Sequence, residues 1–266
     1  MLVGLVYFFV IVLVISVSAI AGISGGVILR PVFDFIGFHQ PIEIGFYMAV
    51  AILTMTISST YKQIKSGTKI KADKALTLAL GAVIGGWIGQ QALEWMSVYF
   101  DSNLLQLIQN ILSILALFFV LFATRPGIKK FALTGAVWYV VAGLLLGSFA
   151  GILAIGGGPI NVAIFTIVFG ITLKEATVYS ITTILFTQLS RLTTMGITGG
   201  FSRFDMSLLM FIIPAAIIGG YMGGKLNVKF NNEQIMKIFK FVVVATIFIN
   251  IWNIIQFGLG TYHFYN

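Results

Sequence analysis

The chain has 266 residues, of which 59% are hydrophobic and only 9% charged. Soluble domains carry about 25% charged residues, so this composition excludes a water-soluble fold and predicts an all-α polytopic membrane protein. The 16 Lys and Arg against 8 Asp and Glu give a net charge of +8, typical of cytoplasmic loops rather than nucleic-acid binding, and the absence of cysteine excludes disulfides and thiolate metal sites.

The hydrophobic pattern divides the chain into two overlong apolar stretches and six spans of ordinary length. Each ordinary span is near the ~20 residues that a helix needs to cross a bilayer. In chain order the elements are the long stretch 1–37, the spans 44–61, 74–95 and 104–123, the long stretch 131–173, and the spans 176–193, 206–224 and 236–257.

The second long stretch is too long for one membrane helix. Residues 131–173 are 43 uncharged residues in a row, which as one helix would extend about 64 Å against a hydrocarbon core of ~30 Å. The glycine clusters AGISGG (21–26) and AIGGGP (154–159) lie where each long stretch would bend. We interpret both stretches as helical hairpins with a long arm, a glycine tip in or near the membrane and a short arm, which gives eight to ten membrane segments.

The two halves of the chain resemble each other. GISGGVILRP at 22–31 aligns with AIGGGPINVA at 154–163, and IGGWIG at 84–89 aligns with IGGYMG at 218–223. We interpret this as an internal duplication, with repeats at 1–124 and 131–258 that form one integrated membrane domain.

Loop charges predict the orientation of the repeats, because Lys and Arg favour the cytoplasmic side. The segments 62–74 and 125–130 are basic, whereas the loop 94–103 carries only acidic charges. If 131–173 doubles back, the later lysines join the basic loops inside and only Arg191 and Arg203 lie outside; a single crossing would put five lysines outside. The repeats are therefore expected to be inverted, each with three crossings plus a hairpin, and both termini outside.

Inverted repeats with interrupted helices are typical of secondary transporters, whose site lies at the repeat interface near the midplane. A helix that restarts at a glycine tip presents free N–H groups and its positive dipole end to an anion, and Ser24 is a candidate cap for the first one. Buried polar side chains near the tips are further candidates. The predicted substrate-binding residues are Ser24, Gly25, Gly26, Arg30, Thr54, Gly156, Gly157, Gly158, Asn161, Thr187 and Gln188.

Alternative interpretations stay open for these residues. The glycines also suit close helix packing, and Arg30 can snorkel or pair with Asp34 instead of binding a ligand. Thr54 and Thr187, which are repeat-equivalent, can simply hydrogen-bond their own helix.

The paired glycine motifs resemble the sulfite exporter TauE/SafE family of membrane permeases. The second motif, GGGPINVAIFTIVFGITLKEATVYS at 156–180, is the stronger, since Ser24 replaces a glycine of the triplet in the first. The resemblance covers nearly the whole chain and implies transport of small sulfur-containing anions such as sulfite, sulfoacetate or other sulfonates, across a bacterial or archaeal plasma membrane.

Two other functions are weighed against this one. An anion channel is the alternative within transport, and Gly22–Gly26 fits the G-x-S-x-G shape of an intramembrane serine protease. The protease needs a histidine base, and the two histidines, His39 and His263, are badly placed for it. No phosphate-binding loop or cofactor motif occurs. The expected partners are a small anion, the bilayer and a coupling proton or cation, with a homo-oligomer also possible and no nucleic acid.

Overall fold

The computed structural model describes residues 2–21, 23–65, 72–125 and 127–258. Over these residues the chain is helical, with a single 3-10 turn, η1 (Met206–Leu208). The α-helices are α1 (Leu2–Ile20), α2 (Gly26–Ile36), α3 (Pro41–Lys65), α4 (Ala72–Tyr99), α5 (Ser102–Ala123), α6 (Ala136–Leu153), α7 (Gly158–Val168), α8 (Leu173–Thr198), α9 (Leu209–Lys229) and α10 (Asn232–Gly258). Lys69, Lys71 and His263 lie outside the described residues.

The predicted all-α polytopic membrane fold is confirmed. Seven helices of the described part are long and apolar enough to cross a membrane: α1, α3, α4, α5, α6, α9 with η1, and α10. The expectation that 176–193 is an ordinary apolar span needs correction, because α8 does not belong to this group. Its 26 residues are long enough to cross, but it carries many polar side chains, which the surrounding helices bury.

Each long apolar stretch breaks into a long and a short helix that folds back. In the first, Tyr7 near the start of α1 stacks on Phe33 near the end of α2, with ring centroids 4.2 Å apart. In the second, Tyr139 near the start of α6 stacks on Phe169 just after α7, also at 4.2 Å. Rings so distant in sequence meet only if the chain reverses, so α1–α2 and α6–α7 are both hairpins.

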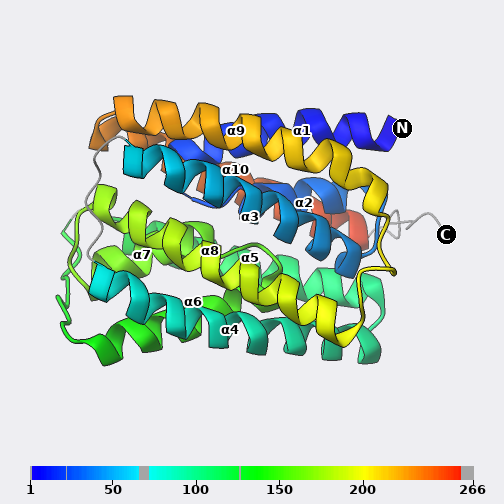
Figure 1. The fold of residues 1–266 in the computed structure, drawn as a ribbon, viewed down its shortest axis with the longest axis horizontal. Coiled ribbons are helices and arrows are strands. Elements are labelled where there is room, and N and C mark those ends of the chain that lie inside the picture. The colour runs from blue at the N-terminus through cyan, green and yellow to red at the C-terminus, as the bar shows by residue number, and fades with distance from the viewer. Residues whose placement is uncertain (1, 22, 66–71, 126, 259–266) are drawn as a thin grey trace.

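The open ends of the two hairpins lie at opposite ends of the molecule. Helix α4 runs from one open end to the other. At its start, the Lys74 amine lies over the ring of Tyr139, at the open end of the second hairpin, 5.2 Å from the ring centroid. Near its other end, Glu94 pairs with Arg203 at 3.1 Å, two residues before Asp205, whose N–H donates to Tyr47 beside Tyr7. The start of α1 and the end of α10 lie together at the right-hand end of Figure 1. The order of elements is the same in both halves, and α2 and α7 each have 11 residues.

Glycine contacts hold each hairpin against a helix of the other half. On α4, a side-chain carbon added at Gly81, Gly85 or Gly89 would lie 2.1–2.3 Å from a carbonyl oxygen of α6. The equivalent pair is α9 with α1, where a carbon added at Gly223 would lie 2.4 Å from the Ser16 carbonyl oxygen. These two pairs form the lower and upper layers of Figure 1. Helices can approach this closely only where no side chain intervenes.

The neighbouring glycines of the IGGWIG and IGGYMG motifs face different partners. Gly85 meets α6, whereas a carbon added at Gly86 would lie 2.8 Å from the Thr187 carbonyl oxygen of α8. In the other repeat Gly219 meets α1, and Gly220 meets the Met55 carbonyl of α3. Each motif thus packs against a hairpin arm through one glycine and against a central helix, α8 or α3, through the next glycine.

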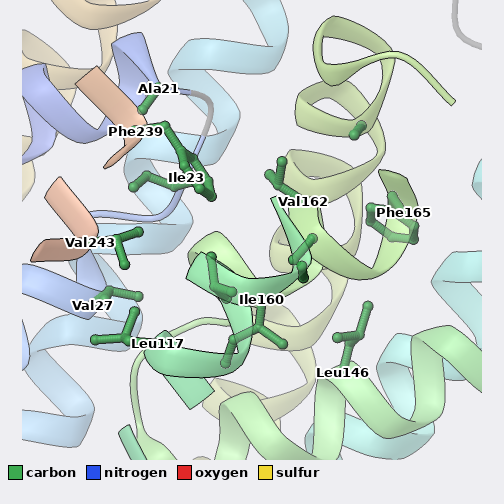
Figure 2. Packing of buried hydrophobic residues seen from close by; sticks show 14 of the residues in the cluster. Ala21, Ile23, Val27, Leu117, Leu146, Ile160, Val162, Phe165, Phe239 and Val243 are labelled. Atoms are coloured by element: carbon green, nitrogen blue, oxygen red, sulfur yellow. The ribbon is translucent and has the colours of Figure 1, made fainter. Parts of the chain in front are cut away.

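A hydrophobic cluster behind the two hairpins joins them to α10. Figure 2 shows Ile23 beside Phe239, and Val27 beside Val243. Ile160 of α7 belongs to the same cluster and is almost completely buried. Burial of these side chains stabilises the positions of both hairpins at once.

Cysteine labelling tests the inverted topology. With no native cysteine, a single cysteine at the exposed Ser202 or Lys229 is the only thiol. We expect a membrane-impermeant maleimide on intact cells to label Ser202→Cys and not Lys229→Cys, because the positive-inside rule predicts that the lysine-rich end faces the cytoplasm. Labelling of Lys229→Cys from outside would contradict the topology, and permeabilised cells control for accessibility.

A second prediction concerns the packing of α4 on α6. Gly85→Ala places a carbon 2.2 Å from the Leu144 carbonyl oxygen, so the helices must separate, at a cost of about 1–3 kcal/mol for an overpacked contact. We expect a clearly lower Tm in detergent. Gly258→Ala is the matched control, since nothing lies within 4 Å of the added carbon. Equal Tm values for the two variants would be inconsistent with this interface.

Candidate functional site

The tips of the two hairpins meet inside the protein. Ser24 Oγ of the first tip donates a 2.9 Å hydrogen bond to the Ile155 carbonyl oxygen of the second. A side-chain carbon added at Gly26 would lie 2.1 Å from the same oxygen, and one added at Gly158 would lie 2.5 Å from Val27 Cγ2. The starts of α2 and α7 are therefore held next to each other, although they lie in different halves of the chain.

The first tip uses glycine for close approach rather than for an unusual backbone. Gly25 is the N-cap of α2 with φ −60°, and no side chain caps this helix. The expectation that Ser24 caps α2 was wrong, because its hydroxyl is directed to the other hairpin. At Gly26 the Ile155 carbonyl occupies the space that a side chain would need.

The second tip needs glycine for its backbone conformation. Gly156, Gly157 and Gly158 have φ values of +73°, +87° and +44°, a region that L side chains rarely adopt. Pro159 follows in the first turn of α7, where its missing N–H costs nothing. A carbon added at Gly157 would lie 2.6 Å from Asn161 Oδ1, so the Asn161 side chain folds back over the tip.

Helix α8 brings polar side chains to the second tip. It starts with a capping box of Thr172 and Glu175. Gln188 is 0% exposed, and a carbon added at Gly156 would lie 2.9 Å from its Nε2. Neither Gln188 Nε2 nor Asn161 Oδ1 has a hydrogen-bond partner among the described residues. Buried polar atoms are normally paired, so these two leave hydrogen-bonding capacity at the tip.

Arg191, one turn further along α8, is the residue that sequence reasoning missed. The expectation that it lies outside as a loop cation was wrong, since it is 0% exposed inside the helix bundle. Its Nη1 donates to Gln188 Oε1 at 2.9 Å, which links it to the tip. Its place three residues after a predicted site glutamine, on the same helix face, was the available signal.

Arg30 is buried as well, but its donors are already engaged. Its Nε pairs with Asp34 at 3.1 Å, and its Nη1 donates to the Pro41 carbonyl at 3.1 Å. Nη2 donates to Gln109, whose own amide donates to the Ile152 carbonyl of α6 at 2.8 Å. The open alternative of pairing with Asp34 is thus observed, and any role of Arg30 toward a ligand stays a prediction.

The two repeat-equivalent threonines lie away from these contacts. Thr54 is half-buried on α3, and the α3 side chain nearest to Gly26 and Gly156 is that of Ile52 instead. Thr187 is buried, and its backbone packs against Gly86 of α4. Their role in binding stays a prediction, although the observed contacts are those of helix packing.

The buried charges near the tips do not balance. Among the described residues the charged side chains classed as buried are Arg30, Asp34 and Arg191. Arg30 and Asp34 neutralise each other, which leaves the charge of Arg191. Ser24, Asn161 and Gln188 are at most 1% exposed. The tips are therefore closed to solvent and lie in a net positive environment.

Comparison of the sequence with protein-family models identifies the family of the chain. The family model described as sulfite exporter TauE/SafE matches residues 7–250, which include both hairpin tips and all the predicted site residues. The chain belongs to the sulfite exporter TauE/SafE family. A search of curated proteins and a search of solved structures found no match. The resemblance inferred from the glycine motifs is thereby confirmed, and a multi-pass permease of this family is the functional class.

The protease alternative gains no support from the geometry of this TauE/SafE protein. The Ser24 hydroxyl donates to a backbone carbonyl, whereas His39 Nδ1 and the Tyr7 hydroxyl lie 2.7 Å apart at the open end of the hairpin. Burial lowers the pKa of His39 below its ordinary value of 6.5. The imidazole is therefore neutral at pH 7, but it has no access to the serine.

Substitution at the second tip tests its importance for transport. Gly157→Ala forces a side chain into φ +87° and against the Asn161 amide, so we expect transport to be lost while membrane insertion survives. Gly127→Ala is the control, because Gly127 has a similar φ of +85° but nothing within 4 Å of the added carbon. Uptake in cells, normalised to the amount of protein in the membrane, gives the comparison. If Gly157→Ala retained as much activity as the control, the tip would have only a packing role.

Proposed function

We propose that this TauE/SafE protein is a secondary transporter of small sulfur-containing anions, with the substrate held between the two hairpin tips. The observation that supports this most is the meeting of two helix N-termini, at Gly26 and Gly158, in a closed and net positive environment. Free N–H groups at helix starts suit oxyanions. Gln188 Nε2, which has no hydrogen-bond partner among the described residues, adds a donor beside the second tip.

The inverted hairpins suggest how access alternates. Their open ends lie at opposite ends of the molecule, while their tips contact each other through Ser24 and Ile155. A small rotation of one hairpin separates the tips toward one end, and rotation of the other does so toward the opposite end. The conformation described here is closed, as expected for the intermediate of a carrier that works around a fixed central site.

The site chemistry favours sulfur oxyanions that carry three oxygens on one sulfur atom. Three oxygens of a sulfonate or sulfite can accept hydrogen bonds from both helix starts and from Gln188 at once. Carboxylates offer only two oxygens in a plane and are expected to bind less well. We place the protein in the plasma membrane of a bacterium or archaeon, with a proton or cation as the coupling ion.

Competition for labelled sulfite uptake into proteoliposomes tests the substrate class. Thiosulfate and methanesulfonate are expected to compete about tenfold better than acetate, and better still than neutral dimethyl sulfone of the same shape as methanesulfonate. Protein-free liposomes are the control. Equal competition by dimethyl sulfone would contradict an anion site built from helix N-termini.

The same preparation separates a carrier from a channel. Vesicles preloaded with unlabelled sulfite should transiently accumulate labelled sulfite above its equilibrium level, because a carrier exchanges substrate across the membrane. A channel gives no such overshoot. Sulfite flux without an overshoot would favour the channel alternative.

A further inference from the structure

We infer that Arg191 is the cation that binds the transported anion, so that the site requires a net negative charge on its substrate. This inference rests on the proposed transport function and names the residue that would confer charge selectivity on it. It follows from the hydrogen bonds, the burial and the charge balance around the guanidinium group.

The guanidinium of Arg191 is held in place but not fully used. Its Nε donates to Gln90 Oε1 of α4 at 3.1 Å, and its Nη1 donates to Gln188 Oε1 at 2.9 Å. Its Nη2 has no hydrogen-bond partner among the described residues. Two neutral amides thus fix the plane of the group and leave one charged donor free.

Two small residues, Gly45 and Ala154, lie near the free donor, and Leu93 borders the same space. A carbon added at Gly45 of α3 would lie 3.7 Å from Arg191 Nη2 and 3.5 Å from Ala154 Cβ at the second tip. Gly45 and Ala154 therefore keep the side-chain volume around Nη2 low. The unpaired Gln188 Nε2 lies against Gly156 of the same tip. Because Arg191 Nη1 donates to Gln188 Oε1, both unused donors lie in one region beside the second tip, between the end of α6 and the start of α7.

The charge of Arg191 has no direct carboxylate partner among the hydrogen bonds of the described residues. The nearest link is indirect: Gln90 Nε2 donates to Glu94 Oε1 at 3.0 Å, while Glu94 itself pairs with Arg203 at 3.1 Å. A buried ion without a counterion is strongly unfavourable. An oxyanion between Arg191 and the α7 start would supply the missing charge and accept from both free donors.

Arg30 shows the contrast with a structural arginine. All three of its nitrogens have partners, and one of these is the buried Asp34 carboxylate. Removal of the Arg30 charge leaves an unpaired buried carboxylate, whereas removal of the Arg191 charge leaves two neutral amides as its former hydrogen-bond partners and Glu94 still paired with Arg203. Neutralising Arg30 is therefore expected to lower the stability of the ligand-free protein, whereas neutralising Arg191 is expected to preserve it.

A structural role for Arg191 is the competing explanation. Ala154 is the C-cap of α6, and a cation near a helix C-terminus is stabilising. On that explanation, loss of the charge lowers the stability of the ligand-free protein and leaves its response to anions intact. On ours, the response to anions is lost and the ligand-free stability is kept.

The test compares purified wild type with Arg191→Gln and Arg191→Lys. For each we would measure the Tm with and without methanesulfonate, and the KM for sulfite uptake in proteoliposomes. We expect methanesulfonate to raise the Tm of the wild type but not of Arg191→Gln, and KM to rise at least about tenfold. Arg191→Lys should restore part of both, because it keeps the charge but loses the fork geometry.

Two further variants serve as controls. Arg125→Gln removes an exposed arginine just after α5, whose guanidinium lies over the Phe122 ring at 5.6 Å, and should leave KM unchanged. Arg30→Gln should lower the Tm even without ligand. If Arg191→Gln does not fold, Arg191→Met is the second neutral variant, and a wild-type KM and Tm response in that folded variant would overturn a role in oxyanion recognition.

The outcomes distinguish this inference from the proposed function. If the wild type neither transports nor responds to any sulfur oxyanion, the proposed function fails. If the wild type transports sulfite while Arg191→Gln keeps its KM and its response to methanesulfonate, the function stands and the inference is wrong. A drop in ligand-free Tm with an intact anion response would assign Arg191 to the cap of α6 instead.

Discussion

The contact between glycine faces and backbone carbonyls is the constraint on which the arrangement of this membrane protein depends. Gly85 on α4 leaves no room for a side-chain carbon against α6, and Gly219 on α9 lies in tight contact with α1. The glycine next to each one admits a central helix, α8 or α3. Since lipid provides no hydrophobic force between helices, such close packing is what positions them. The hairpin tips meet only because both contacts hold at once.

The interlocking of the two halves follows from the same contacts. The first hairpin is held by α9 of the second half, and the second hairpin by α4 of the first half. The tips then meet through Ser24 and the Ile155 carbonyl. A movement of α4 or α9 against its neighbours therefore shifts the hairpin of the other half, which is consistent with the alternating access proposed for this TauE/SafE protein.

The two buried arginines differ in whether their hydrogen-bond donors and their charge have partners. Around Arg30, the carboxylate of Asp34 and the amide of Gln109 complete a neutral network that joins α2 to α5. Around Arg191, the hydrogen-bond partners are two neutral amides and one donor stays free. The first set fits a structural role and the second fits a binding site, because a folded protein retains an uncompensated buried charge mainly where a ligand can neutralise it.

The sequence by itself determined the class, the number of long helices, the hairpins and the family. These features follow from local quantities: the low charge content, the length of the uncharged run at 131–173 and the glycine motifs. Only the tertiary structure decided that Arg191 is buried, that Ser24 bonds to the other hairpin and that Arg30 is neutralised. The reason is physical: an arginine or serine in an apolar sequence is compatible with a lipid-facing, capping or buried position. Which of these positions the side chain takes depends on partners such as Gln90 and Ile155. These lie about a hundred residues away or more and are brought close only by packing of the two halves.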